Sequence, residues 1–200
     1  MKVIGIIPVK KTSERLPGKN FMLIAGCELW VHSVEYAKAE GIEPVVSTDS
    51  ADVMEWCRRQ EVRYIEELVD DRNMCNCIDQ VLKEVSCDYF VLLQPTSPIR
   101  QPGLVQNILT LGVDTSVYTA DKVKIIGHIG GQFHTAYRDQ EASTKFLYHF
   151  DGNIVVANTP WYRNNRKLFN DESKWVVEGV PYSLQIDTES DFKLIERIMD

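Results

Sequence analysis

Residues 2–8 read Lys-Val-Ile-Gly-Ile-Ile-Pro, an apolar run typical of a buried strand. A polar segment with a Pro-Gly pair follows at once, from Val9 to Asn20. The two together predict a strand that ends in a loop with four cations: Lys10, Lys11, Arg15 and Lys19. Such a loop can bind phosphate through backbone N–H groups and cationic side chains, although a solvated surface loop is an equal alternative. The stretch is neither a Walker A sequence nor a G-x-G-x-x-G fingerprint, which argues against the standard ATPase and dinucleotide sites.

Apolar runs and amphipathic stretches continue to alternate through the first two thirds of the chain. The pattern predicts strands over 44–48, 62–65 and 89–93, and helices over 29–39, after Asp49 or Ser50, and over 75–85. Strands that alternate with helices favour a mainly parallel sheet covered on both faces, with ligands at the carboxyl ends of its strands. We therefore expect the loops Val9–Asn20 and Gln94–Arg100, together with Asp49, to share one edge of the sheet.

The pattern changes after Asp114. Short strands are predicted over 117–119, 123–128 and 132–137, with a hairpin turn at Gly130-Gly131. A return to alternation predicts a strand over 153–157, a helix over 161–166, a strand over 183–186 and a helix over 188–199. Thr188 and Asp191 form the pattern of a capping box at the start of that last helix. The chain is therefore expected to be a single domain, 1–200, with a β-rich arm at roughly 118–150.

Composition narrows the class of protein. A chain of 200 residues corresponds to about one domain at roughly 150 residues each. Its 22 Lys and Arg against 29 Asp and Glu leave a net charge of −7, which disfavours nucleic acid as a partner. Five cysteines without a Cys-x-x-Cys pair argue against a disulfide framework and favour reduced thiols in the cytoplasm. The apolar run from Val3 to Val9 is far too short to span a membrane.

The segment Ile7–Asn20 resembles the signature loop of the acylneuraminate cytidylyltransferases, the CMP-sialic acid synthetase family. Further similar segments follow in the family's order: Val46–Asp49, Ile78–Leu82, Leu92–Arg100 and Ile186–Glu189. Asp151–Ile154 is similar to the family's Asn-Gly-Ala-Ile-Tyr strand, but the rest of 119–183 matches weakly. The ordered set covers most of the first hundred residues and the C-terminal end.

The resemblance implies a three-layer, Rossmann-like nucleotidyltransferase domain of the α/β class, with a mainly parallel sheet. It implies that the β-rich arm reaches into a partner subunit, so that the protein is a homodimer. The implied reaction is transfer of CMP from CTP to a 2-keto-3-deoxy sugar acid, similar to sialic acid, with release of pyrophosphate. Positioning and charge neutralisation dominate such a reaction, and Mg2+ is the implied cofactor.

By the same resemblance, the catalytic residues are Lys10, Lys19 and Asp187, and Asp187 is the magnesium ligand. A hard cation that bridges phosphate oxygens is well served by one carboxylate, because it keeps several waters. The implied nucleotide-binding residues are Pro8, Val9, Lys10, Ser13, Lys19, Asn20 and Asp79. The implied acceptor-binding residues are Gln94, Thr96, Ser97 and Lys145.

Several positions depart from the family's pattern. Lys10 replaces a usual Arg, Glu14 stands where a Lys is common, Gln185 replaces a second acid near the metal, and Asn73 replaces an Asp. The alternatives are a nucleotidyltransferase with another small acid acceptor and a catalytically degenerate protein that binds a nucleotide or sugar. A hydrolase is the weakest reading, because the chain offers no evident nucleophile–base pair.

Overall fold

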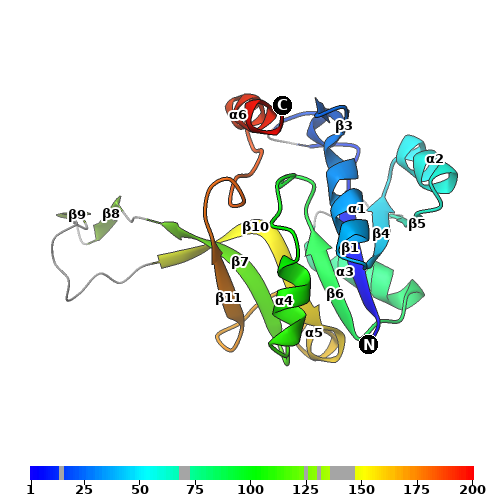
Figure 1. Cartoon of the computed structure of the whole chain (residues 1–200). Coiled ribbons are helices and arrows are strands. Elements are labelled where there is room, and N and C mark those ends of the chain that lie inside the picture. The colour runs from blue at the N-terminus through cyan, green and yellow to red at the C-terminus, as the bar shows by residue number, and fades with distance from the viewer. Residues whose placement is uncertain (14–15, 68–72, 124–125, 130–131, 136–146) are drawn as a thin grey trace.

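The computed structural model describes residues 1–13, 16–67, 73–123, 126–129, 132–135 and 147–200. Within 122–149 it describes the backbone, and elsewhere in these ranges it describes side chains as well. Its centre is a seven-stranded sheet in the order β11-β7-β10-β6-β1-β4-β5 (Figure 1). These strands are β1 (Val3–Val9), β4 (Glu43–Thr48), β5 (Arg63–Glu66), β6 (Tyr89–Leu93), β7 (Ser116–Val123), β10 (Leu147–Asn158) and β11 (Lys174–Glu178). A two-stranded sheet, β2 (Leu23–Ile24) with β3 (Cys27–Glu28), lies in the segment that follows the first loop.

The central strands are parallel. β1 pairs with β4 on one side and with β6 on the other, and β5 extends the parallel set beyond β4. β10 runs antiparallel to both β6 and β7, while β11 is parallel to β7. The expectation of a mainly parallel α/β sheet is confirmed.

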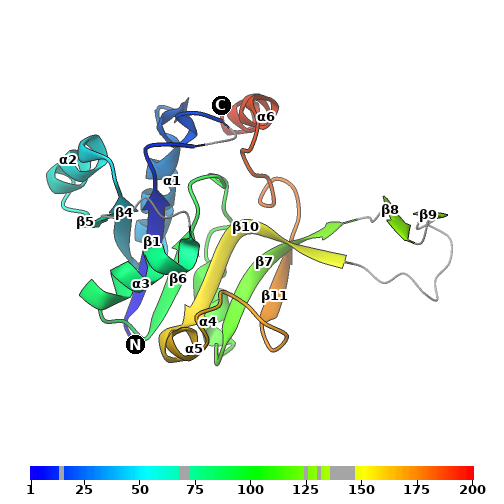
Figure 2. The same ribbon diagram turned by 180° about the vertical axis from the view of Figure 1, so that it is seen from behind.

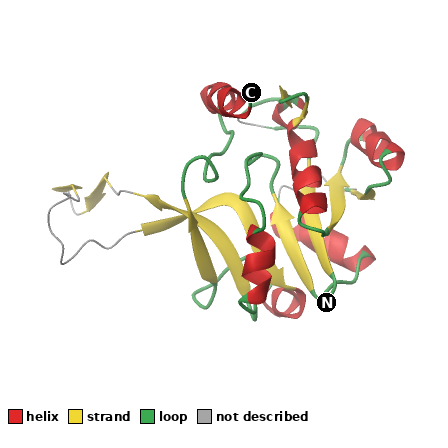
Figure 3. Cartoon of the chain, in the orientation of Figure 1, coloured by secondary structure: helices red, strands yellow, loops and turns green. Residues whose placement is uncertain are grey.

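Helices cover both faces of this sheet (Figures 2 and 3). One face packs against α1 (Leu29–Ala39), α2 (Ala51–Arg59) and α4 (Leu104–Thr110). The other face packs against α3 (Met74–Glu84) and α5 (Thr159–Asn165). The period of two along β1 sends Ile4 and Ile6 to the second face and Ile7 and Val9 to the first, so that all four are fully buried. This is the three-layer arrangement expected from the sequence.

A third apolar cluster closes the carboxyl edge of the sheet. α6 (Glu189–Met199) buries Phe192 and Ile195 against Ile24 and Leu29, and Ile186 joins them. Figure 1 shows α6 above the carboxyl ends of the strands, beside the segment that carries β3. The C-terminal helix is thereby tied to the segment that follows the first loop.

The β-rich segment projects from the body. β8 (Ile126–Ile129) pairs antiparallel with β9 (Gln132–Thr135), and this pair lies beyond the ends of β7 and β10 (Figures 1 and 2). The expected turn at Gly130-Gly131 lies outside the described residues. β7 runs continuously from the main sheet to Val123, so the arm boundary at 118 and the single-domain division stay predictions.

Several sequence-based assignments were wrong or missing. Residues 183–186 are not a strand, because turn bonds such as Tyr182 N to Gly179 O (2.8 Å) bend the chain just before them. The edge strand is instead β11, which the sequence analysis did not identify, and α4 was also missed. The segment predicted as one strand over 123–128 contains the end of β7 and the start of β8. The strand predicted over 132–137 is β9, which ends at Thr135.

All five cysteines are free thiols, as expected. Among the described residues, no helix combines the length and the apolar character that crossing a membrane requires.

Candidate functional site

The candidate site lies where the order of the parallel strands reverses. The chain runs from β1 outward through β4 to β5, and then returns to place β6 on the other side of β1. In open α/β sheets such a reversal leaves a crevice at the carboxyl ends of the strands. The described residues of the loop 10–20 after β1, and the segment 94–103 after β6, follow the strands on this edge, where the rule predicts a crevice.

The described residues of the loop after β1 are held by hydrogen bonds within the loop and to Asp49. Gly18 has a φ of 70°, a conformation that favours glycine, and it leads into the short helix η1 (Lys19–Phe21). The Asn20 side chain donates to the Lys10 carbonyl at 3.0 Å, and the Lys11 N–H donates to Asp49 Oδ1 at 2.7 Å. Asp49, at the end of β4, therefore holds the loop at the shared edge, as expected.

Lys19 and Asp187 form the central pair of the site. Lys19 Nζ lies 3.2 Å from Asp187 Oδ1 and donates to the Ile186 carbonyl at 2.7 Å. The Lys19 side chain is 8% exposed, whereas that of Asp187 is 31% exposed. The two residues are 168 positions apart in sequence, so the fold brings together the implied phosphate-binding lysine and the implied metal ligand.

Asp187 is presented by the start of α6. Thr188 caps this helix in a complete capping box with Asp191, and the Asp187 N–H donates to Asp191 Oδ2 at 3.1 Å. Ile186 is fully buried, and its N–H donates to the Thr96 carbonyl at 2.8 Å. Asp187 thus stands between a capped helix and the segment after β6.

We predict that Thr188→Ala lowers the free energy of unfolding by about 1 kcal/mol, because the first turn of α6 loses its side-chain cap. Denaturant unfolding measures the change. Ser50→Ala is the matched control, because Ser50 is an N-cap position whose side chain makes no capping hydrogen bond. An equal loss in both variants would contradict the prediction.

Lys10 has a partner that the sequence analysis missed. Its Nζ lies 3.8 Å from Glu67 Oε2, and the Glu67 side chain is only 4% exposed. Glu67 follows β5, where its N–H donates to the Thr48 carbonyl at 2.8 Å. The available signal was the pair of acids, Glu66 and Glu67, that follows the strand predicted over 62–65, because strand ends meet at the site edge.

The other implied nucleotide-binding residues have different surroundings. The Val9 side chain is fully buried in the core, so that only its backbone faces the loop, while Pro8 and Ser13 are partly exposed. Asp79 lies on α3 and accepts hydrogen bonds from Tyr162 Oη (3.0 Å) and Arg166 Nε (2.6 Å). These bonds tie α3 to α5, and a nucleotide role for Asp79 stays a prediction.

One further departure from the family pattern, Asn73, lies among the described residues. Asn73 caps α3, since its Oδ1 accepts from Cys75 N at 2.9 Å. Glu14 and Arg15 lie outside the described residues.

The segment after β6 is fixed by a buried arginine. Arg100 is 6% exposed and donates to the Gln94 carbonyl at 2.6 Å and to Ser33 Oγ at 3.1 Å. Burial lowers the pKa of Arg100 to about 10, so the guanidinium keeps its charge at neutral pH. Gln94 and Thr96 are partly exposed, whereas Ser97 is fully buried with an unpaired hydroxyl. Lys145 lies outside the described residues.

A buried polar group, which we call the bulge cluster, consists of Thr119, Asp151, Asn153 and Glu178. The register of β10 against β7 shifts between Phe150 and Val155. Asp151 Oδ1 accepts from Thr119 Oγ1 (2.6 Å) and from Asn153 N (3.0 Å). Asn153 Nδ2 donates to Glu178 Oε2 at 2.8 Å. The sequence analysis assigned no role to these residues.

Glu178 makes stability depend on pH. Burial and the nearby Asp151 raise its pKa from 4.5 to about 7, against the hydrogen bond from Asn153 and the charge of Arg100. The folded state therefore binds this proton more tightly than the unfolded chain. Protonated Glu178 therefore contributes up to about 3 kcal/mol to the free energy of unfolding. This contribution is complete below about pH 4.5 and is lost as the pH rises through about 7.

In the parent protein, we therefore expect the free energy of unfolding to decrease between about pH 4.5 and 7. In Glu178→Gln, this decrease is expected to be absent. Denaturant titrations at several pH values measure this slope. Glu84→Gln, an exposed position at the end of α3, is the control. A variant slope identical to that of the parent would contradict the assignment.

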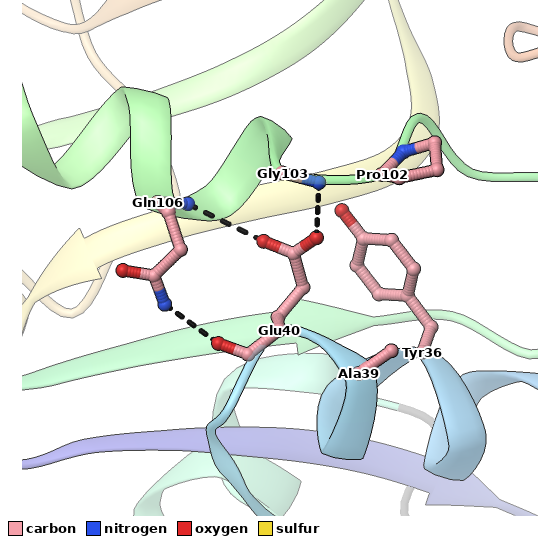
Figure 4. Close-up of a pocket in the computed structure, with 6 residues that line it drawn as sticks. All are labelled: Tyr36, Ala39, Glu40, Pro102, Gly103 and Gln106. Carbon is pink, nitrogen blue, oxygen red and sulfur yellow. Dashed lines mark hydrogen bonds between the residues drawn. The ribbon is translucent and has the colours of Figure 1, made fainter.

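A small hollow elsewhere has a structural explanation (Figure 4). It is lined by Tyr36, Ala39, Glu40, Pro102, Gly103 and Gln106, between α1 and α4. The Glu40 carboxylate accepts from the N–H groups of Gly103 (2.5 Å) and Gln106 (3.4 Å) at the start of α4. The Gln106 side chain donates to the Glu40 carbonyl at 2.6 Å. Glu40 therefore serves as the cap of α4.

The residues present fit a metal held by one carboxylate. The described residues include no group of three or more His, Cys, Asp or Glu side chains arranged for a metal ion. Asp187 is partly exposed and already faces a cation, the Lys19 ammonium. A hard cation whose other ligands are water and phosphate oxygens suits such an arrangement.

Comparison with known proteins adds independent findings. A family model described as "Cytidylyltransferase" matches residues 4–198. A CMP-N,N'-diacetyllegionaminic acid synthase of Legionella pneumophila is 27% identical over 231 residues, which cover 100% of this chain and 97% of that protein. An N-acylneuraminate cytidylyltransferase of Streptococcus agalactiae serotype III is 28% identical over 96% of this chain. The chain spans about half the length of that relative (52%).

Solved structures support the fold. A CMP:2-keto-3-deoxy-manno-octonic acid synthetase in complex with CTP superposes with a TM-score of 0.74 at 18% identity, over 100% of this chain and 98% of that chain. A bifunctional IspDF from Campylobacter jejuni gives a TM-score of 0.71 at 13% identity, over 96% of this chain and 54% of that chain. At these identities the likeness concerns the fold alone.

Proposed function

The chain belongs to the cytidylyltransferase family, and we propose that it transfers CMP from CTP to a 2-keto-3-deoxy sugar acid with release of pyrophosphate. The acceptor's anomeric hydroxyl oxygen forms the new bond to the α-phosphorus of CTP, the bond from that phosphorus to pyrophosphate breaks, and the hydroxyl proton is released to solvent. The relative that matches over nearly its whole length is named for such a product. The observation that carries the proposal is the pairing of Lys19 with Asp187 at the strand-order reversal, beside the segment 94–100.

Lys10 and Lys19 bind the triphosphate in this proposal. A nucleotide in the crevice between loop 10–20 and segment 94–103 lies within reach of both ammonium groups. Their positive charge stabilises the charge that develops on the leaving pyrophosphate. Ser13, Asn20 and the backbone at Pro8 and Val9 complete the nucleotide contacts in the proposal.

Asp187 would hold Mg2+, with Lys19 shifting from the carboxylate to phosphate oxygens. When bound, the ion supplies charge neutralisation and orientation at those oxygens. Gln94, Thr96 and Ser97 flank the acceptor side, where Arg100 fixes the backbone of Gln94. The acceptor hydroxyl is thereby oriented toward the α-phosphorus.

Binding without catalysis is a second candidate, and one observation favours it. Both implied phosphate-binding lysines face carboxylates, Lys10 at Glu67 and Lys19 at Asp187. These pairs reduce the positive charge available to a triphosphate. A protein of this kind binds CTP or a sugar acid but releases no pyrophosphate.

Pyrophosphate release separates the two candidates. The parent protein is incubated with Mg2+, each of CTP, UTP, ATP and GTP, and a panel of 2-keto-3-deoxy sugar acids and small non-sugar acids. Release that requires CTP and one of the sugar acids is expected. Release with a different nucleotide or only with a non-sugar acid would overturn the proposed substrates. CTP binding in calorimetry without release would favour the binding protein.

We predict that Glu67→Gln lowers the KM for CTP about threefold to tenfold, because Lys10 loses its buried negative partner and attracts the triphosphate more strongly. Steady-state kinetics at fixed acceptor concentration measure the effect. Glu66→Gln removes the same charge from the exposed neighbouring position and is the control. An unchanged or higher KM in the Glu67 variant would contradict the role of the pair.

We also propose that the protein is a cytoplasmic homodimer. The β8–β9 pair lies away from the body in Figures 1 and 2, and an isolated two-stranded hairpin is marginally stable in water. A second copy supplies the missing contacts for this arm. Light scattering after gel filtration is expected to give twice the chain mass, and a chain mass at micromolar concentration would contradict the dimer.

A further inference from the structure

The bulge cluster contains polar atoms that lack partners. Asp151, Asn153 and Glu178 are 4%, 1% and 4% exposed. One oxygen of each side chain has no hydrogen-bond partner: Asp151 Oδ2, Asn153 Oδ1 and Glu178 Oε1. Buried polar atoms in native proteins are almost always hydrogen-bonded, so three unpaired atoms in one cluster require an explanation.

All three unpaired atoms accept hydrogen bonds when the carboxyls are ionised. The donors inside the cluster are already used, since Thr119 Oγ1 and Asn153 N serve Asp151 Oδ1 and Asn153 Nδ2 serves Glu178 Oε2. Arg100 is the cation whose charge acts on Glu178, but its Nη1 and Nη2 donate to Ser33 and Gln94. Its buried Nε has no hydrogen-bond partner, so this donor does not serve the cluster either. The cluster therefore lacks hydrogen-bond donors rather than acceptors.

The Gln185 side chain packs against the backbone of the cluster at Gly152. Gly152, between Asp151 and Asn153, has a φ of 75°, and a Cβ built on it would overlap the side-chain amide of Gln185. Gln185 is two residues from Asp187. The next residue, Ile186, bonds through its N–H to Thr96 in the acceptor-side segment. The cluster thus adjoins the acceptor side of the crevice, with the Gln185 side chain across Gly152.

We propose that Asp151, Asn153 and Glu178 form a subsite for the hydroxyl and amide N–H substituents of the acceptor, which opens when the Gln185 side chain turns away from Gly152. The inference rests on the proposed function, because it describes the acceptor of that same site. Carboxylates and an amide oxygen accept bonds from such donors and repel a carboxylate. The acid group of the acceptor therefore binds elsewhere, and its polyhydroxylated or acylamino part enters the subsite.

Acceptor kinetics test the subsite. Asn153→Ala and Glu178→Gln are each expected to raise the acceptor KM at least about tenfold, the equivalent of one buried hydrogen bond, while the KM for CTP changes less than about twofold. Two acceptor analogues, one without a hydroxyl and one without an acylamino group, are compared with the full acceptor. The parent is expected to have a higher KM for the analogue that lacks the group bound in the subsite, and the variants are expected to show no such difference. The analogue that behaves in this way identifies the group that binds in the subsite. Gln185→Ala is expected to leave acceptor binding intact.

Ser116→Ala is the matched control, because Ser116 is buried on the same sheet and bonds to Ser173 Oγ (2.8 Å) outside the cluster. Thermal unfolding of every variant shows whether it is folded. An unchanged acceptor KM, or equal rises in the KM for acceptor and for CTP, would overturn the subsite while the proposed function stands.

Calorimetric titration of the parent and the Glu178 variant with the sugar acids decides the case in which the parent releases no pyrophosphate. If the parent bound a sugar acid and the Glu178 variant bound it more weakly, the subsite would be supported although the proposed function had failed. Equal binding by both proteins, or no binding by either, would overturn the subsite as well.

Discussion

Asp187→Ala is expected to lower kcat/KM for pyrophosphate release about 1000-fold. The variant removes the carboxylate that would hold the metal against the phosphate oxygens. It also leaves the Lys19 ammonium with its bond to the Ile186 carbonyl but without its bond to Asp187. The loss is expected mainly in kcat, because the carboxylate acts on charge that develops during transfer. Initial rates across a magnesium titration measure both the loss and the shift in the metal concentration required.

The matched control is Glu189→Gln, which removes a negative charge from the exposed first turn of the same helix. That variant is expected to keep the parent's rate within about twofold, because Glu189 is paired with Lys193 at the surface. Parent-like activity in Asp187→Ala would exclude Asp187 as the metal ligand. If Asp187→Ala lost most of its activity but required the same magnesium concentration as the parent, the role of Asp187 would lie in the folding of the start of α6.

Lys19→Met is expected to lower kcat/KM about 100-fold. Methionine fills a similar volume in this buried position, so that the apolar part of the side chain is replaced while the ammonium is lost. Two effects add: the triphosphate loses a cation, and Asp187 loses the partner that orients it. Lys11→Met is the control, because Lys11 is an exposed cation in the same loop whose N–H, not its side chain, bonds to Asp49.

The double variant Lys19→Met with Asp187→Ala tests whether the pair acts as a unit. Residues in direct contact are non-additive, so the double variant is expected to be little slower than Asp187→Ala alone. Losses that multiply to about 100,000-fold would show that the two residues act independently, contrary to the geometry of the pair.

The sequence identified elements wherever one local signal was sufficient. β6 was predicted with its observed bounds because Tyr89–Leu93 is a continuous apolar run that prolines end. The capping box at Thr188 was predicted because its residues are three apart in sequence. Local periodicity gave no such signal for β11, a short edge strand whose pairing with β7 joins residues far apart in the chain.

The candidate site shows the same difference between features that a local sequence signal predicts and features that only the fold brings together. The resemblance supplied Lys19 and Asp187 separately, but nothing in their local sequence states that the two side chains meet. Glu67 was missed because its significance lies in its contact with Lys10, and seven elements of the fold separate the two residues along the chain. The bulge cluster was missed for a similar reason, because β7, β10 and β11 each contribute a part of it.

The sequence by itself determined the alternation of strands and helices, the edge of the sheet at which ligands bind, and the class of reaction that its ordered motifs imply. The first two follow from periodicities and spacings within about ten residues, where the chain's own geometry dictates the outcome. The class of reaction follows from the resemblance of the motifs to a known family. Only the tertiary structure decided which charges neutralise one another and which buried oxygens lack donors. Those properties depend on distances between side chains from different strands and loops, which are set by the packing of helices on both faces of the sheet and not by any local segment.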